Sequence, residues 1–255
     1  MPEQKPKTKK VRLDALLVDR GLVENRSRAQ ALVMAGKVFS NEQKLDKAGK
    51  QVSEDIPLEV RGQDHPWVSR GGLKLAHGLK CFKVEPADMI CVDVGASTGG
   101  FTDVLLQNDA LRVYAVDVGH GQLAWKLRSD DRVVVMERCN ARYLTADDIS
   151  DPIDLIVCDA SFIGLRTVLP AVMTLAKPGA GLIALIKPQF EVGKGRVGKG
   201  GVVRDSAQHE EVCEMIRHWV DDLPDWHSIG LEVSPITGPE GNKEFLIYGL
   251  KDNEV

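Results

Sequence analysis

The stretch Val92-Asp93-Val94-Gly95-Ala96-Ser97-Thr98-Gly99-Gly100-Phe101 decides the fold of this 255-residue chain. It ends a strand pattern in a glycine turn, and a helical pattern follows over residues 101–106. Glycine suits such a turn because the backbone bends sharply and a ligand can approach where a Cβ would otherwise stand. A second strand pattern ends at Asp117, 22 residues after Gly95. Nucleotide-binding folds place a carboxylate against ribose hydroxyls at this spacing, so we predict a nucleoside-containing cofactor.

The residues of the turn favour one cofactor over another. Dinucleotide sites use the pattern G-x-G-x-x-G, but Ser97 stands where that pattern needs its middle glycine. S-adenosylmethionine carries no phosphate, and a looser glycine turn can hold its amino-acid end. The turn therefore favours a methyltransferase that uses S-adenosylmethionine over a dehydrogenase. The predicted cofactor contacts are Gly95, Ala96, Ser97, Thr98, Gly99, Gly100, Asp117, Asn140 and Asp159.

Strand and helix patterns alternate through the rest of the chain, which is typical of a parallel, doubly wound sheet. The predicted strands are 90–94, 113–116, 133–136, 153–158 and 181–186, and the helical intervals lie near 98–107, 121–127, 165–176 and 206–220. Two later strand patterns, 228–233 and 244–248, predict an antiparallel hairpin at one edge. The predicted fold class is α/β, a Rossmann-like methyltransferase sheet.

Composition excludes several other classes. The longest apolar runs have the length of a strand, far short of the roughly 20 residues that span a bilayer. The lysine-rich N-terminus has no apolar segment behind it, so we predict neither a secretory signal nor a membrane partner. Five dispersed cysteines predict buried thiols in a cytoplasmic protein. The six histidines show no ligand spacing, and no metal is predicted.

The first 80 residues differ in charge from the rest of the chain. They hold 16 Lys and Arg against 10 Asp and Glu, whereas the remaining residues hold 17 against 27. A basic module suggests a polyanionic partner. Helical patterns near 12–20 and 27–35, the second with Ser27 as its N-cap, precede strand patterns at 37–41 and 58–61.

This order resembles the S4-type RNA-binding domain, a small α+β unit, through Leu13-Asp14-x-x-Leu17, Ser27-Arg28-x-x-Ala31 and Gly36-Lys37-Val38. The resemblance implies RNA contacts by Arg12, Arg26, Arg28 and Lys37. The alternative is a cap that packs only on its own chain. The predicted divisions are a disordered basic tail (1–9), the S4-type domain (10–62), a linker (63–68) and the sheet domain (69–255). Trp67, within this linker, is expected in a core or interdomain contact.

Ionisable residues stand where ligands bind in open α/β sheets, beyond the carboxyl ends of strands. Asp159 and Lys187 end predicted strands, and Glu244 opens the last one. If that strand is antiparallel, Glu244 lies at the same end of the sheet. Lys74 belongs to a Ser-Arg-Gly-Gly-Leu-Lys motif before the first strand.

Two lysines and two carboxylates suit methyl transfer to a hydroxyl group. A ribose hydroxyl must give up its proton as it attacks, and a lysine whose pKa is lowered can accept that proton. Methylation of a base nitrogen usually relies on an Asn/Asp-Pro-Pro-aromatic turn. Residues 159–162 are Asp-Ala-Ser-Phe, without either proline, which favours oxygen as the acceptor.

Nearly the whole chain resembles the TlyA-type family of ribosomal RNA methyltransferases, which join an S4 domain to an FtsJ-like domain and often carry the name haemolysin. The shared motifs lie at 69–75, 93–102, 158–163, 187–191, 200–205 and 238–244. The resemblance implies a catalytic tetrad at Lys74, Asp159, Lys187 and Glu244. It also implies 2′-O-methylation of cytidine in ribosomal RNA, with S-adenosylmethionine as the donor. The target nucleotide, the ribosomal subunit and the choice between monomer and homodimer stay open.

The glycine- and lysine-rich segment 193–201 nearly matches a phosphate loop, but Gly200 replaces the Ser or Thr that would bind magnesium. We interpret it as a basic lid over RNA, against the alternatives of an inert loop and a nucleotide site. The predicted RNA contacts outside the S4-type domain are Lys194, Arg196 and Lys199 of this segment, together with Arg70. Two rival functions remain for the chain: a membrane-lytic protein, and an RNA-binding protein whose methyltransferase fold is inactive.

Overall fold

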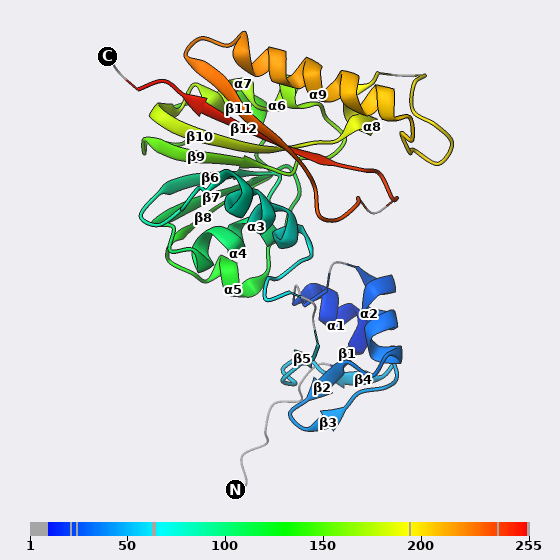
Figure 1. The fold of residues 1–255 in the computed structure, drawn as a ribbon. Helices are drawn as coiled ribbons and strands as arrows, with labels where there is room; N and C mark the ends of the chain where they lie inside the picture. The colour runs from blue at the N-terminus through cyan, green and yellow to red at the C-terminus, as the bar shows by residue number, and fades with distance from the viewer. Residues whose placement is uncertain are drawn as a thin grey trace, which may run out of the picture.

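The computed structural model describes residues 10–20, 22–23, 25–62, 65–193, 195–238 and 240–253. The predicted basic tail, the glycine after the first helix, the first two linker residues and Lys194 lie outside these ranges. Two domains follow one another along the chain (Figure 1).

A seven-stranded sheet forms the centre of the C-terminal domain, with the order β11-β12-β10-β9-β6-β7-β8. Its parallel part consists of β6 (Ile90–Val94), β7 (Arg112–Asp117), β8 (Val133–Glu137), β9 (Ile153–Cys158) and β10 (Ala176–Ile186). The hairpin β11 (Trp226–Val233) and β12 (Phe245–Lys251) completes it, and β12 runs antiparallel to β10. The predicted sheet class and the edge hairpin are confirmed.

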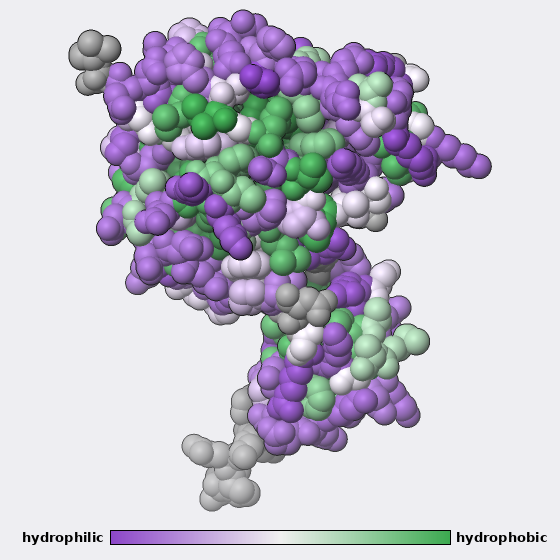
Figure 2. All heavy atoms as spheres, in the orientation of Figure 1, coloured by the Kyte–Doolittle hydropathy of each residue, from purple (hydrophilic) through white to green (hydrophobic). Residues whose placement is uncertain are grey.

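Helices cover both faces of this sheet (Figure 1). On one face α3 (Gly71–Phe82), α4 (Gly100–Gln107) and α5 (Trp125–Arg128) close a core with the inner strands. On the other face α6 (Leu165–Val168), α7 (Pro170–Met173) and α9 (Ser206–Asp221) close a second core, while the short α8 (Pro188–Glu191) follows β10 and η1 (Ala141–Tyr143) follows β8. Apolar atoms remain visible over β11 and β12, between the polar surfaces of α9 and α3 (Figure 2).

Two predicted helices are shorter than expected. The helix predicted over 121–127 begins only at Trp125, because Gly121 has a left-handed φ of 68° and Ala124 is extended. The helix predicted over 165–176 is interrupted at Pro170, whose ring leaves no N–H for a continuous helix. Residue 176 already belongs to β10, which therefore starts earlier than the predicted strand.

The N-terminal domain has its own core under α1 (Leu13–Asp19) and α2 (Arg26–Met34). Both predicted strand segments are present, as β2 (Val38–Ser40) and β5 (Glu59–Val60), with β3 (Gln43–Lys44) beside β2. The pair β1 (Lys10–Arg12) and β4 (Gln51–Ser53) was not predicted from the sequence. The predicted N-cap of α2 is wrong, because the side chain of Asn25, not Ser27, accepts the hydrogen bond from the Arg28 N–H.

Segment 65–68 packs onto the C-terminal domain. Trp67 contacts the core beneath α3, and a Cβ at Gly72 would lie 2.7 Å from its ring, so this position has no room for a side chain. The Val68 N–H donates to the buried carboxylate of Asp103 on α4 at 2.7 Å. The expected core contact of Trp67 is confirmed.

The cysteines are less uniformly buried than predicted. Cys91, Cys158 and Cys213 are buried, but Cys139 is half-buried and Cys81, on the outer side of α3, is exposed. Cys81 belongs to α3, and a single cysteine carries no periodic pattern that would predict which side of its element is buried. Among the helices in the described ranges, none combines the length and the apolar character that crossing a membrane requires.

Candidate active site

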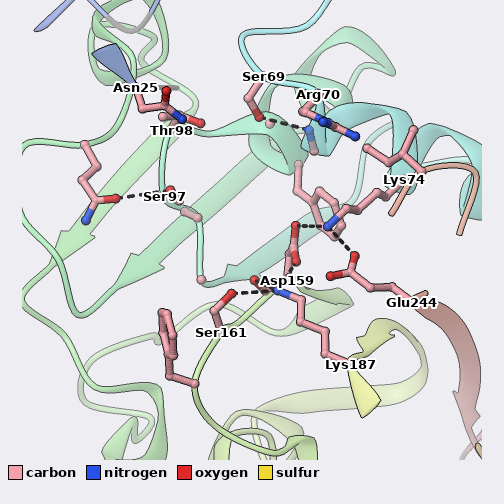
Figure 3. A pocket seen from close by; sticks show the side chains of 18 of the residues that line it. Asn25, Ser69, Arg70, Lys74, Ser97, Thr98, Asp159, Ser161, Lys187 and Glu244 are labelled. Atoms are coloured by element: carbon pink, nitrogen blue, oxygen red, sulfur yellow. Dashed lines mark hydrogen bonds and ion pairs between the residues drawn. The ribbon is translucent and has the colours of Figure 1, made fainter. Parts of the chain in front are cut away.

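The predicted strand-end residues meet at one edge of the sheet. Asp159 and Lys187 follow directly after the parallel strands β9 and β10. Glu244 precedes β12, and the antiparallel direction of that strand brings its start to the same edge. Lys74 reaches them from the first turn of α3. All four residues of the predicted tetrad therefore lie together (Figure 3).

The four side chains form a continuous series of alternating charges. Lys74 Nζ lies 2.7 Å from Glu244 Oε2 and 3.3 Å from Asp159 Oδ2, and Lys187 Nζ lies 2.6 Å from Asp159 Oδ1. Lys187 Nζ also donates to the Asp159 carbonyl at 3.0 Å and to Ser161 Oγ at 2.9 Å. Each lysine lies against at least one carboxylate, and this pairing makes the burial of the four polar groups tolerable.

Burial within this series separates the two lysines from bulk water. The side chains of Lys74 and Lys187 are only 8% and 6% exposed. Burial by itself would lower the pKa of Lys74, but the charges of Asp159 and Glu244 outweigh it, and the net pKa is raised. Lys74 is consequently a permanent cation, suited to holding negative charge rather than to accepting a proton.

Glu244 is almost fully buried because the turn before β12 leaves room for it. A Cβ on Gly238 would lie 2.7 Å from Glu244 Oε1. Asn242, also buried, accepts a hydrogen bond from the Val203 N–H at 3.0 Å and donates to the Gly201 carbonyl at 2.9 Å. The amide thereby fastens the end of the glycine-rich segment 193–201 to the turn that carries Glu244.

The glycine turn between β6 and α4 has a backbone conformation that few other residue types could adopt. Gly95 has φ +83°, and a Cβ there would lie 2.8 Å from the Ala160 Cα, in the segment that follows β9. Ser97 also has a positive φ, of 49°, and its N–H donates to Asp117 Oδ2 at 2.8 Å. The second oxygen of Asp117 accepts from the Gly119 N–H at 2.6 Å. The predicted cofactor turn and Asp117 are thus joined directly.

Two neighbouring cavities open at this edge. One, of about 760 Å³, is lined by the tetrad, most of the glycine turn and Arg70. The other, of about 590 Å³, is lined by Asp117, Asn140 and Asp159. The two cavities share Gly95, Ser97, Gln122, Asp159, Ser161 and Phe162. A ligand in the second cavity would therefore meet the tetrad at Asp159.

Gly99 differs from the other residues predicted to bind the cofactor. It lines neither of these two cavities, and a Cβ there would lie 2.2 Å from Leu127 of α5. Gly99 is the N-cap residue of α4 and has a left-handed φ of +94°. Tight packing against α5 accounts for this glycine without a ligand.

The sequence analysis assigned no role to Phe162, which the structure places over the site. Its side chain is 90% exposed, its φ is +65°, and its ring lies 5.3 Å from that of Phe190. An exposed aromatic ring on a strained backbone, lining both cavities, is a feature of ligand sites. The only signal in the sequence was its place in the motif at 158–163.

The residues predicted to contact RNA are dispersed, and several already have partners. Arg12 and Arg26 both donate to the fully buried carboxylate of Asp14, at 2.8 and 3.2 Å, while Arg28 is exposed. Lys37 donates to the Gly62 carbonyl. Arg70 lines the larger cavity, while Arg196 pairs with Glu211 of α9, and Lys199 lies in the same segment as Arg196.

Comparison with known proteins agrees with both domains. The model of the FtsJ-like methyltransferase family matches residues 67–251, and that of the S4 domain matches residues 11–55. The chain belongs to the FtsJ-like methyltransferase family. Its S4 domain places it among the members of TlyA type, which join the two domains in this order.

Several relatives are similar over almost their entire length. The chain is 51% identical to "Putative rRNA methyltransferase YqxC" of Bacillus subtilis (strain 168), covering 94% of this chain and 86% of that protein. It is 47% identical to "16S/23S rRNA (cytidine-2'-O)-methyltransferase TlyA" of Mycobacterium tuberculosis (strain ATCC 25618 / H37Rv), covering 94% and 90%.

A solved structure confirms the arrangement of the elements. It is titled "Putative hemolysin from Streptococcus thermophilus", is 44% identical, and superposes with a TM-score of 0.75 over 97% of this chain and 92% of that one.

Proposed function

We propose that this protein transfers a methyl group from S-adenosylmethionine to the ribose 2′-hydroxyl of a cytidine in ribosomal RNA. The observation that carries the proposal is the buried Glu244–Lys74–Asp159–Lys187 series at the edge of the glycine turn. The name of the Mycobacterium tuberculosis relative describes the same reaction. Because its proposed substrate is ribosomal RNA, we propose that the protein acts in the cytoplasm.

The residues present fit S-adenosylmethionine. Asp117, at the end of β7 and in the wall of the smaller cavity, offers a carboxylate to ribose hydroxyls. Asp159 lies where the two cavities join, so its negative charge would face the sulfonium group. When bound, the cofactor supplies a methyl group attached to a positively charged sulfur.

The four residues of the tetrad would have different roles in the transfer of one proton and one methyl group. Lys187 would act as a neutral amine, after releasing its own proton to solvent, and would accept the proton of the 2′-hydroxyl at Nζ as that oxygen takes the methyl group. Asp159 holds Lys187 in place at 2.6 Å, and the cationic Lys74 stabilises the negative charge that develops on the ribose oxygen. Glu244 keeps Lys74 charged and oriented.

Phe162 is the best-placed residue to hold the target base. Sequence-specific recognition of RNA targets unstacked bases in loops, bulges and ends, and exposed aromatic rings bind such bases by stacking. Replacement of a stacking residue by alanine costs about 1–3 kcal/mol for each base. Phe162→Ala should therefore raise the KM for RNA, and by more than it weakens cofactor binding, because the ring also lines the smaller cavity.

The decisive experiment maps ribose methylation in 16S and 23S ribosomal RNA from cells with and without this protein. We expect one or more cytidines to lose 2′-O-methylation in the deletion strain and to regain it with the wild-type gene. Lys187→Ala should not restore the modification. Lys177→Ala is the matched control, because this lysine is exposed at the other end of β10 and pairs with Asp154.

Two outcomes would contradict the proposed function. Unchanged ribose methylation in the deletion strain, together with cofactor binding by the purified protein, would indicate a different acceptor. Lysis of erythrocytes or liposomes by the purified protein, without methyl transfer, would support the rival function that the name haemolysin suggests.

A further inference from the structure

Three potential metal ligands meet on the outer side of the C-terminal domain. They are His77 and Cys81 of α3 and Glu232 of the edge strand β11. Their ligand atoms all lie within 4.8 Å of one another, and Cys81 Sγ is 3.4 Å from His77 Nε2. The expectation that the histidines have no ligand spacing overlooked the His-x-x-x-Cys pair at 77 and 81.

Local structure explains why these three side chains converge. Residues four apart on a helix lie on the same face, one turn above the other, so His77 and Cys81 are neighbours. Gly230 lets α3 approach β11, since a Cβ there would lie 3.1 Å from the ring of Phe82 at the end of α3. Glu232, two residues further along the strand, extends from the same face as Gly230 and thus toward α3.

We propose that His77, Cys81 and Glu232 bind a divalent cation of the zinc type, with water in the fourth position. One nitrogen, one sulfur and one oxygen donor suit Zn²⁺, whereas Mg²⁺ and Ca²⁺ prefer oxygen alone. Tetrahedral bonds of zinc length place ligand atoms about 3.3–3.8 Å apart. Small side-chain rotations would close the observed separations to these values.

The exposure of the cluster also suits a metal site. Cys81 and Glu232 are exposed and His77 is half-buried, so an ion can enter from solvent. Within the described ranges no cation pairs with Glu232, and Cys81 is the one exposed cysteine of the five. Coordination would release the thiol proton of Cys81 to solvent, so affinity should rise with pH.

The bound ion would connect the helix that carries Lys74 to the edge hairpin. Cys81 lies seven residues beyond Lys74, about 10 Å further along the helix axis. The ion is therefore separate from the tetrad, and its effect would be to hold α3 against β11. Because only the folded protein brings the three ligands together, zinc should raise the melting temperature.

The test uses the full-length, reduced and chelator-treated protein, titrated with Zn²⁺ by calorimetry and with Co²⁺ by absorbance. Wild type should bind one ion, show the spectrum of a tetrahedral cobalt site with a thiolate ligand, and melt at a higher temperature with zinc. His77→Ala and Cys81→Ser should lose all three effects, and Glu232→Gln should weaken binding. His218→Ala is the matched control, since this histidine is exposed on α9 and lies outside the cluster.

Two results would contradict the proposed metal site, and they can be distinguished from each other. Binding that survives in the double variant His77→Ala/Cys81→Ser, or that requires millimolar zinc, would overturn the site. Zinc-dependent dimers in ultracentrifugation, with no thermal effect on the monomer, would show that the ligands come from two molecules and would also overturn it. Methyl transfer by Cys81→Ser should equal that of wild type, so this proposal can fail while the proposed function stands.

Discussion

The two lysines of the tetrad, Lys74 and Lys187, have different surroundings, which suit them to different roles in catalysis. Lys74 contacts two carboxylates, which raise its pKa, while Lys187 contacts one carboxylate, a carbonyl and a hydroxyl. A residue that must take up a proton cannot be held permanently charged by two anions. We therefore assign proton transfer to Lys187 and electrostatic stabilisation to Lys74.

Lys187→Ala should reduce single-turnover methyl transfer to ribosomal RNA by about 10²–10⁴-fold, the usual contribution of a general base. Cofactor and RNA affinity should change little, because the side chain contacts mainly the tetrad and Ser161. The measurement is the rate at saturating cofactor. A rate near that of wild type would leave positioning alone as the catalytic contribution of the tetrad.

Asp93, within β6, predicts an unusual dependence of stability on pH. Its side chain is fully buried; burial and the charges of Asp159 and Asp117 raise its pKa to about 7, although hydrogen bonds from Thr102 oppose the rise. An unfolded aspartate releases its proton near pH 3.9. Between these two values the folded state holds a proton that the unfolded state has lost, so the contribution of Asp93 to the free energy of unfolding falls as pH rises.

Asp93→Asn removes this titration while keeping an oxygen that can accept from Thr102. We expect the difference in unfolding free energy between the variant and wild type to move in favour of the variant from pH 4.5 to pH 7.5. Urea unfolding at several pH values measures it. A difference that is constant over this interval would show that Asp93 does not titrate there.

The turn after β6 and the segment after β9 depend on each other. Gly95 packs against the backbone of Ala160 and Asp159, so the absence of a side chain in the cofactor turn sets the position of a tetrad carboxylate. The edge hairpin acts in a similar way, because its antiparallel direction places Glu244 beside Lys74. The site is thus assembled by contacts between elements rather than within one element.

Gly95→Ala should destabilise the protein by more than the roughly 1–3 kcal/mol expected from a strained left-handed residue alone, because the new Cβ also collides with Ala160. Gly193→Ala is a matched control, since Gly193 has φ +76° and nothing within 4 Å of an added Cβ. Urea unfolding and cofactor titration should both show a larger loss for Gly95→Ala. Equal losses would mean that the close approach to Ala160 is relieved without cost.

At the scale of the whole molecule, we propose that the S4 domain recognises RNA and that the C-terminal domain carries out the chemistry. The tetrad and the glycine turn lie in the acidic part of the chain, while the S4 domain lies in the basic part. Arg12 and Arg26 are already tied to Asp14, so the exposed Arg28 is the better probe of RNA binding. Its only described hydrogen bond uses the backbone N–H.

Arg28→Glu should weaken RNA binding and flatten its dependence on salt concentration, because fewer counterions are released. Cofactor affinity should not change. Lys80→Glu, at an exposed position of α3, is the matched control. Binding curves at several salt concentrations measure the slope, and an unchanged slope would point to segment 193–201 as the main RNA contact.

Much of this protein could be predicted from the order of its residues. Alternating strand and helix patterns predicted the sheet, because burial on two faces requires apolar runs at regular intervals. Positions at strand ends predicted that Asp159, Lys187 and Glu244 meet at one edge of the sheet, whereas Lys74 and the tetrad as a unit came from the family motifs. Helix limits were less predictable where Gly121 and Pro170 changed the backbone locally.

Other features required the tertiary structure, because they join residues with no shared pattern. The sequence by itself determined the sheet and its edge hairpin, and it predicted the four residues that we propose as the tetrad. The folded chain decided that Lys74 keeps its charge between Asp159 and Glu244, that the exposed ring of Phe162 lines both cavities, and that Glu232 faces His77 and Cys81. Periodicity reports which side of an element is buried, whereas charge, pKa and ligand geometry depend on neighbours that only folding brings within a few ångströms.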